Sequence, residues 1–251
     1  MDNIHRGSSP RPRTVFHGPL FVSCLTYELT RRVGVERSGG VFVQMVRAPD
    51  SNALPAARTV ARLTQLGAEL DLFHGVSSCL PKARSRAAAA AFASGAAYWL
   101  MCDDDVEAPT ATLVDLINAA GPPSEARISV LPCLVRGSAQ RTNCEFRGES
   151  RLNAEASAWV RPVSLAGCGL MVVTRAALER LFAVYREELG FTDDDGQGRV
   201  ALFNMLLEPP RWYGEDYSFC RRADRAGVPI DALVQGVSTH DGQDLDLDSL
   251  R

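Results

Sequence analysis

Short apolar runs alternate with amphipathic stretches along this chain. Apolar runs rich in β-branched and aromatic residues predict buried strands, and longer stretches with apolar positions three or four apart predict helices. Proline near the start and glycine just after the end mark several of the helices. The strands are predicted at 19–27, 69–74, 98–103, 127–135, 165–174 and 230–237. The helices are predicted at 55–66, from Pro81 to Gly95, from Pro109 to Gly121, after Thr174 and from Gly214 to Gly227.

This alternation of strand and helix predicts the fold class α/β, with a mostly parallel central sheet flanked by helices on both faces. In such sheets, ligands bind beyond the carboxyl ends of the strands. We expect one domain at 18–242, preceded by a flexible N-terminal arm at 1–17 and followed by a C-terminal tail at 243–251. Within residues 31–50, Gly39 and Gly40 break the chain, and the run at 41–46 fits a further strand or half of a hairpin.

Composition and charge narrow the class of protein. The chain has 251 residues, of which 46% are hydrophobic and 23% charged, as in globular proteins. Its net charge of -3 gives no general attraction to polyanions, so a nucleic acid would need a local basic patch. The seven cysteines lack close-spaced pairs, which favours reduced thiols in a cytoplasmic protein over disulfides or a zinc site. Residues 1–13 are polar and predict neither a signal peptide nor a membrane anchor.

Three consecutive carboxylates, Asp103, Asp104 and Asp105, follow the apolar run at 98–102. Side chains alternate along an extended chain, so Asp103 and Asp105 are expected on one side and Asp104 on the other. Two close carboxylates repel each other unless a cation or a donor-rich ligand lies between them, and oxygen ligands suit magnesium or manganese. The stretch therefore predicts a divalent metal site at a strand end, with a solvated acidic turn as the alternative.

Glu215 and Asp216 open the helix that is predicted from Gly214. Exposed amides at a helix N-terminus favour ionised carboxylates, so helix capping explains the pair without any chemistry. The other interpretation is a general base. An apolar wall of Trp212 and Tyr213 would raise the proton affinity of such a base by desolvation, as the activation of a hydroxyl requires.

Four further features bear on a site. His240 ends the last predicted strand, where it is either a hydrogen-bonded surface residue or a metal ligand. Gly167 and Gly169 allow a ligand to come close to the backbone. The polar, arginine-containing stretch at 136–161 predicts a long loop or a short hairpin, which is either an acceptor-side flap or solvated surface. The acidic residues at 193–195 predict a surface turn.

Four of these pieces, taken in order, resemble the nucleotide-sugar-dependent glycosyltransferases of the GT-A fold, close to the family 2 type. The pieces are D-x-D at 103–105, A-G-C-G-L at 166–170, G-E-D-Y-S-F-C-R-R-A-x-x-A-G at 214–227 and T-H-D-G at 239–242. The resemblance covers about residues 19–242. It implies a single GT-A-like (Rossmann-like) domain that moves a sugar from a nucleotide-diphosphate sugar, a UDP-sugar above all, to an acceptor hydroxyl with Mn²⁺ or Mg²⁺ as cofactor.

The resemblance also implies a role for individual residues. Asp216 corresponds to the catalytic base of inverting members, and Glu215 to a supporting carboxylate. The implied metal ligands are Asp103, Asp105 and His240. The residues implied on the donor side are Thr26, Tyr27, Arg84, Asp103 and Asp104. Retaining relatives use similar motifs without a general base, so the anomeric outcome stays open.

Two other functions fit the same residues. A nucleotidyltransferase also uses paired aspartates on a parallel sheet but has no need of Glu215 and Asp216, and a non-catalytic nucleotide-sugar-binding domain would keep the fold alone. The acceptor is open between a sugar, a lipid-linked glycan, a protein side chain and a hydroxylated base in DNA. A DNA acceptor would use Arg141, Arg147 and Arg151.

Overall fold

The structure is a computed structural model that describes residues 20–26, 55–65, 70–76, 79–103, 105–135, 137–138, 140–154 and 157–251. The predicted arm at 1–17 and the segment at 31–50 lie outside these residues. In the described part, the helices fall where the sequence predicts them. They are α1 (Pro55–Gln65), α2 (Leu80–Ser94), α3 (Thr110–Ala119), α4 (Arg175–Leu189) and α5 (Glu215–Arg225).

The ends of the helices follow from local chemistry. Thr174 caps α4, because its side-chain oxygen accepts a hydrogen bond from the amide of Ala177. Gly95 ends α2 in the left-handed conformation at φ 72°, which glycine adopts without steric cost. Gly227, at φ 68°, follows α5 in the same way. These caps confirm the predicted helix limits.

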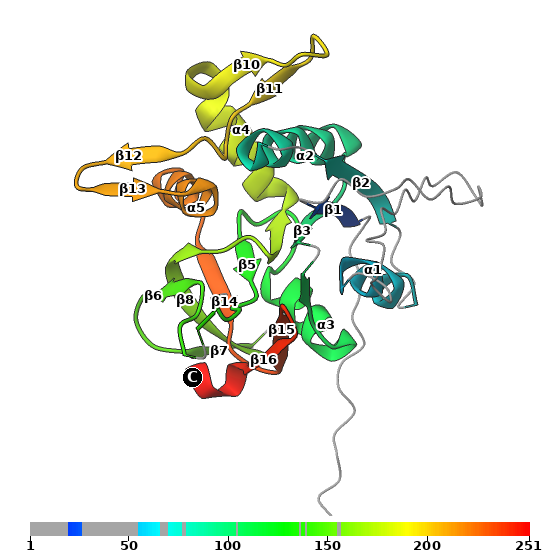
Figure 1. Cartoon of the computed structure of the whole chain (residues 1–251), viewed down its shortest axis with the longest axis vertical. Helices are drawn as coiled ribbons and strands as arrows, with labels where there is room; N and C mark the ends of the chain where they lie inside the picture. The colour runs from blue at the N-terminus through cyan, green and yellow to red at the C-terminus, as the bar shows by residue number, and fades with distance from the viewer. Residues whose placement is uncertain are drawn as a thin grey trace, which may run out of the picture.

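The main sheet has the strand order β2-β1-β3-β9-β5-β14-β8-β6, and β7 pairs with β8. Its strands are β1 (Leu20–Thr26), β2 (Leu70–Val76), β3 (Tyr98–Asp103), β5 (Ile128–Val130), β6 (Cys144–Phe146), β7 (Arg151–Asn153), β8 (Ala158–Ala166), β9 (Leu170–Thr174) and β14 (Ile230–Leu233). The architecture is mixed α/β, with helices between several of the successive strands (Figure 1).

The prediction of a mostly parallel sheet is wrong. Only β1–β2, β1–β3 and β5–β14 pair in parallel among the described strands, whereas β9 runs antiparallel to both β3 and β5, and β8 antiparallel to β14, β6 and β7. A parallel connection needs a long crossover, usually a helix. No described helix lies between β5 and β9, where β6, β7 and β8 come instead. The chain therefore enters β9 from the opposite end of the sheet.

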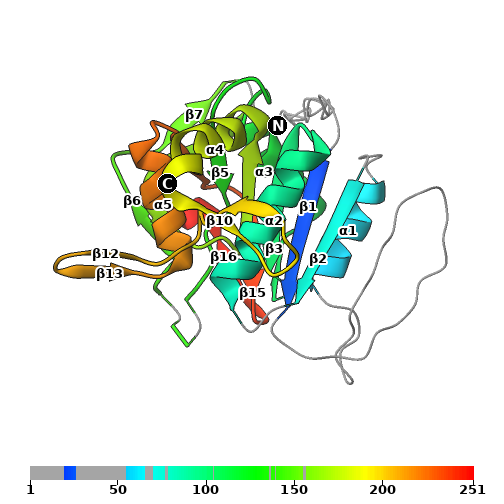
Figure 2. The same cartoon turned by 90° about the horizontal axis from the view of Figure 1, so that it is seen from above.

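Two hydrophobic cores lie on the two faces of the main sheet. Trp99 and Met101 of β3 face the core that contains residues of α2, α4 and α5. Their neighbours Leu100 and Cys102 face the other core, which contains residues of α1 and α3. This alternation follows from the two-residue period of a strand. Figure 2 shows α2 and α4 lying across the strands of the sheet.

Three small sheets complete the described fold. Two of them are hairpins, β10 (Gly190–Thr192) with β11 (Gly198–Val200) and β12 (Leu206–Glu208) with β13 (Arg211–Tyr213), and both project from the body of the molecule in Figure 1. The third has the order β16-β15-β4, formed by β16 (Gln243–Asp246), β15 (Val237–His240) and β4 (Val106–Glu107). The residues predicted as a tail thus form β16 and the 3-10 helix η1 (Leu247–Leu250), whose Leu247 is fully buried.

The stretch predicted as an acceptor-side flap contributes β6, β7 and the start of β8 to the main sheet. Two of its arginines form ion pairs within the chain: Arg147 lies 3.0 Å from Asp224, and Arg151 lies 2.6 Å from Asp231. Arg161 stacks over the ring of Phe146 at 4.7 Å. Arg147 joins the end of β6 to α5, and Arg151 and Arg161 join strands, so all three are less available to an anionic acceptor than arginines of a solvated flap.

Candidate active site

A cavity of about 380 Å³ lies where the end of β3, the start of α5, the end of β15 and the turn from β8 to β9 meet. Strand β3 is buried as far as Cys102 and brings Asp103 out at its carboxyl end. The residues predicted from the sequence that line the cavity are Asp103, Gly167, Gly169, Glu215, Asp216 and His240. Segments that are far apart in the chain thus bring their predicted site residues to one place.

Asp105 and His240 form a close pair beside this cavity. In the register of β15 with β4, His240 lies opposite Val106, which places it next to Asp105. His240 Nε2 is 3.3 Å from Asp105 Oδ2, and His240 Nδ1 is 2.6 Å from the carbonyl oxygen of Leu134. A carbonyl oxygen only accepts, so Nδ1 carries the hydrogen and Nε2 is the ring nitrogen that faces the carboxylate.

This pair fits a hard divalent cation. Two acceptor atoms at this distance need a proton or a cation between them, and two ligands of one ion at about 2.1 Å and at right angles lie about 3 Å apart. The bond from Nδ1 to a backbone carbonyl is the usual support of a metal-bound histidine. No group of three or more His, Cys, Asp or Glu side chains in the described part of the chain is placed to hold a metal. The protein would therefore supply two ligands, as in sites that magnesium completes with water and substrate phosphates.

Asp103 lies outside the pair that fits a metal, although the sequence predicted it as a ligand. Arg84 Nη2 donates to both of its carboxylate oxygens, at 3.2 and 3.1 Å. The same nitrogen is 3.4 Å from Oδ1 of Asp216. Arg84, predicted as a donor-side residue, is only 2% exposed and joins the two carboxylates from beneath the cavity. Asp103 therefore links the strand end to α5 through Arg84.

Aromatic rings form the floor under Arg84. The guanidinium lies 6.0 Å from the centre of the Phe203 ring, which stacks on Phe219 at 4.6 Å, and Trp99 meets both rings edge-on. Phe219 belongs to the buried side of α5. The predicted apolar wall is wrong for Trp212, whose side chain is 73% exposed on the β12–β13 hairpin. Trp212 and the buried Tyr213 are neighbours in β13 and point to opposite faces of it.

Negative charge dominates the cavity. Asp103 and Asp216 flank the guanidinium of Arg84, Glu215 lines the cavity beside Asp216, and Asp105 pairs with His240 at the cavity edge. Burial raises the pKa of Glu215, and the adjacent charge of Asp216 raises it further. Burial also raises the pKa of Asp103, against the lowering effect of Arg84. This excess of carboxylates favours a cation or a ligand rich in hydrogen-bond donors.

Two glycines allow the walls of the cavity to approach each other. A Cβ atom on Gly169 would lie 2.9 Å from Val106 Cγ2, and one on Gly167 would lie 2.5 Å from Asn143 Nδ2. The side chain of Asn143 accepts a hydrogen bond from the amide of Cys133 at 2.9 Å. The sequence did not single out Asn143 as a site residue, because an isolated asparagine in a polar stretch carries no signal of its place. Burial raises the pKa of Cys133 to about 12, so its thiol stays protonated at neutral pH.

The structure does not describe the side chains of three residues that are predicted on the donor side. Tyr27 and Asp104 lie outside the described residues. Thr26 ends β1, beside the end of β3, because its neighbour Leu25 pairs with Asp103. The backbone of Thr26 therefore ends at the same edge of the sheet as Asp103.

The acidic turn at 193–195 differs from its prediction. The turn is present, but Asp193 is only 5% exposed and bonds with basic residues of two elements. Arg86 Nε lies 2.5 Å, Arg199 Nε 2.7 Å and Lys82 Nζ 3.1 Å from its carboxylate. Asp193 thus ties α2, which carries Arg84, to the β10–β11 hairpin. Turn composition alone could not reveal these distant partners.

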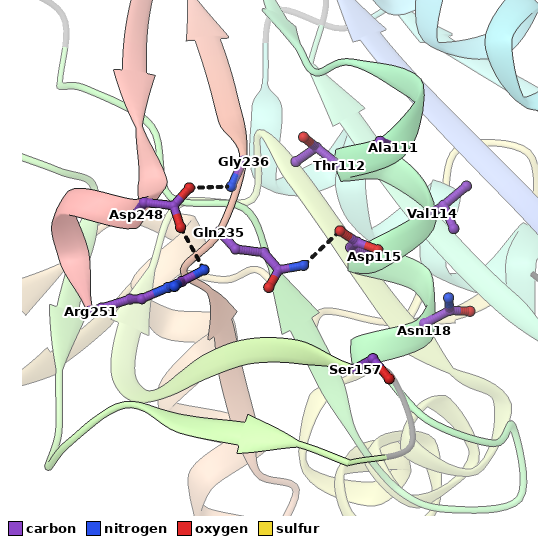
Figure 3. Close-up of a pocket in the computed structure, with 10 residues that line it drawn as sticks. All are labelled: Ala111, Thr112, Val114, Asp115, Asn118, Ser157, Gln235, Gly236, Asp248 and Arg251. Carbon is purple, nitrogen blue, oxygen red and sulfur yellow. Dashed lines mark hydrogen bonds and ion pairs between the residues drawn. The ribbon is translucent and has the colours of Figure 1, made fainter. Parts of the chain in front are cut away.

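A second cavity, of about 550 Å³, lies between α3 and the last residues of the chain (Figure 3). Gln235 Nε2 donates to Asp115 at 2.7 Å, and Asp248 accepts from the amide of Gly236 at 3.2 Å and pairs with Arg251 at 2.5 Å. Since these polar groups bond with one another, the cavity offers fewer free groups to a ligand. The candidate active site is therefore the smaller cavity at the end of β3.

Six cysteines, at positions 79, 102, 133, 144, 168 and 220, are free thiols in the described part of the chain. This confirms, for those six, the prediction of reduced cysteines. Among the described residues, no helix has the length and apolar character needed to cross a membrane.

Comparisons with known proteins do not assign the chain to a family. No protein-family model matches it, and no curated protein matches it in sequence. A solved structure with a similar course of the chain is the crystal structure of A197 from STIV. It is 13% identical, the match covers 92% of this chain and 91% of that chain, and the TM-score is 0.48. A likeness at this level assigns neither a fold family nor a function.

Proposed function

We propose that this protein is a metal-dependent glycosyltransferase that moves a sugar from a nucleotide-diphosphate sugar, a UDP-sugar above all, to an acceptor hydroxyl. The observation that carries the proposal is the convergence of Asp103, Glu215, Asp216 and His240 on one cavity, with Asp105 paired to His240 at its edge. Three of the four motifs behind the resemblance supply these five residues, and the fourth supplies Gly167 and Gly169 of the same cavity. Helix capping alone would not require α5 to begin against a strand end rich in carboxylates.

The residues divide the work of the reaction. Asp105 and His240 would hold Mn²⁺ or Mg²⁺, which supplies neutralising charge for a diphosphate leaving group. Asp216 takes the proton of the acceptor hydroxyl as its oxygen attacks the anomeric carbon, and the bond from that carbon to the diphosphate breaks. Glu215 lies beside it as a supporting carboxylate. Gly167 and Gly169 line the same cavity, and their lack of a side chain lets Asn143 and Val106 pack close to the backbone there.

Release of nucleoside diphosphate from UDP-sugars in the presence of Mn²⁺ tests the proposal. We expect slow hydrolysis of at least one UDP-sugar, its loss in Asp216→Asn, and its retention in the control Asp224→Asn, which changes a half-exposed carboxylate on the same helix. Release of pyrophosphate from a nucleoside triphosphate would indicate a nucleotidyltransferase instead. Binding of UDP-sugars without any turnover, including with a panel of hydroxyl acceptors, would indicate a non-catalytic binding domain.

A further inference from the structure

One nitrogen of Arg84 contacts both carboxylates of the candidate site. Nη2 is 3.1 Å from Asp103 Oδ2 and 3.4 Å from Asp216 Oδ1. The contact with Asp103 is a hydrogen bond, and the contact with Asp216 is an ion pair. Arg84 therefore sets the distance between the end of β3 and the first turn of α5.

The contact also fixes which oxygen of Asp216 is accessible. Asp216 Oδ1, the atom near Arg84, is buried and has no hydrogen-bond partner among the described residues. The side chain as a whole is 26% exposed and lines the cavity. The accessible oxygen is therefore Oδ2, and the charge of Arg84 holds Oδ1 inward.

Arg84 itself is firmly held. It is 2% exposed, lies on α2 and rests on the ring of Phe203, which stacks on Phe219. Its Nε and Nη1 atoms are buried and have no hydrogen-bond partner in the described part of the chain. Buried donors without partners are rare in folded proteins and call for an explanation. The two carboxylates give one, since Arg84 is placed to serve them and not to satisfy its own remaining donors.

We propose that Arg84 is a positioning residue for Asp216, which it turns so that Oδ2 meets the acceptor hydroxyl. The inference rests on the proposed function, in which Oδ2 accepts the proton of the hydroxyl whose oxygen bonds to the anomeric carbon. It differs from the donor-binding role that the resemblance implies for Arg84. A donor-binding residue acts on donor affinity, whereas a positioning residue acts on the chemical step at saturating donor.

The contact is tested without any substrate by a double-mutant cycle on thermal unfolding. The variants are Arg84→Met, Asp216→Asn and the double variant. Arg84→Met leaves Asp216 Oδ1 buried beside no cation, so removing that charge in the double variant should restore part of the lost stability. We expect the midpoint shift of the double variant to be smaller than the sum of the single shifts. Additive shifts would refute the contact. If Arg84→Met does not fold, Arg84→Gln, which also removes the charge, takes its place in the cycle.

The role in the reaction is tested by steady-state kinetics with Mn²⁺ and whichever UDP-sugar the hydrolysis screen identifies. Misplacement of a reacting group by about 1 Å costs about 100-fold. We expect Arg84→Lys, which keeps the charge but not the forked geometry, to lower kcat by about 10- to 100-fold with little change in KM. Arg175→Lys, on α4, is the control and should match the wild type.

A rise in KM with unchanged kcat would overturn the proposal and make Arg84 a donor-binding residue. Absence of turnover in the wild type would refute the proposed function, and with it the role of Asp216 as a base. Additive midpoints in the unfolding cycle would instead refute the contact of Arg84 with Asp216 alone.

Discussion

Replacing Gly169 by alanine should disturb the candidate site through one measurable overlap. The new Cβ would lie 2.9 Å from Val106 Cγ2, at least about 0.5 Å closer than ordinary van der Waals contact. Val106 is only 2% exposed and is branched at Cβ, so its side chain cannot turn away freely. The strain must therefore move β4, which pairs with β15 beside His240.

Overpacking of this kind costs about 1–3 kcal/mol, which corresponds to a fall of about 2–12 °C in the unfolding midpoint for a chain of this size. Thermal unfolding of purified Gly169→Ala measures it. The matched control is Gly198→Ala, whose Cβ would meet nothing within 4 Å and whose backbone is not left-handed. If both variants unfold within about 1 °C of the wild type, Gly169 is not needed for the close approach of β4.

Three further predictions concern single side chains. Asp216→Asn should lower turnover by about 100- to 10,000-fold and leave donor affinity unchanged, and an equal loss of affinity in calorimetry would argue against a general base. His240→Ala should weaken donor binding more with Mn²⁺ than with Mg²⁺, because imidazole suits the softer ion, and equal losses would leave His240 a structural residue. Hydrogen bonds from Arg86, above all, and from Lys82 lower the pKa of Asp193. Ionised Asp193 therefore stabilises the fold fully above the pKa of the unfolded state, near 3.8, and this stabilisation is lost as the pH falls below that value. The difference in unfolding midpoint between the wild type and Asp193→Asn should thus shrink below about pH 4, and a difference that stays constant down to pH 3 would contradict this.

Local signals in the sequence predicted the elements well. Thr174, Gly95 and Gly227 mark helix limits through backbone chemistry that depends on adjacent residues alone. Local signals did not predict the direction of the strands. The apolar run of β9 reads the same in either direction, and only the three strands inserted after β5 decide that it runs antiparallel to β3. Periodicity carries no information about that choice.

Local signals in the sequence predicted part of the site as well. Asp105 and His240 each follow or end an apolar strand, so their meeting at one edge of the structure was within reach of the sequence. The contact of Arg84 with Asp216 was not, because it depends on how α2 and α5 pack over the same face of the sheet. The burial of Asp193 depends in the same way on two other elements. Helix α2 lies far from it in the chain, and β11 follows it across a turn.

The most direct test of the proposed function is the position of Mn²⁺ and UDP in crystals of the full chain soaked with both. We predict an anomalous manganese peak within about 2.3 Å of Asp105 and His240 Nε2, with the diphosphate beside it in the cavity that Asp103, Glu215 and Asp216 line. A manganese peak or a bound UDP at another place, or neither at saturating concentrations, would contradict the assignment of this cavity as the donor site of a glycosyltransferase.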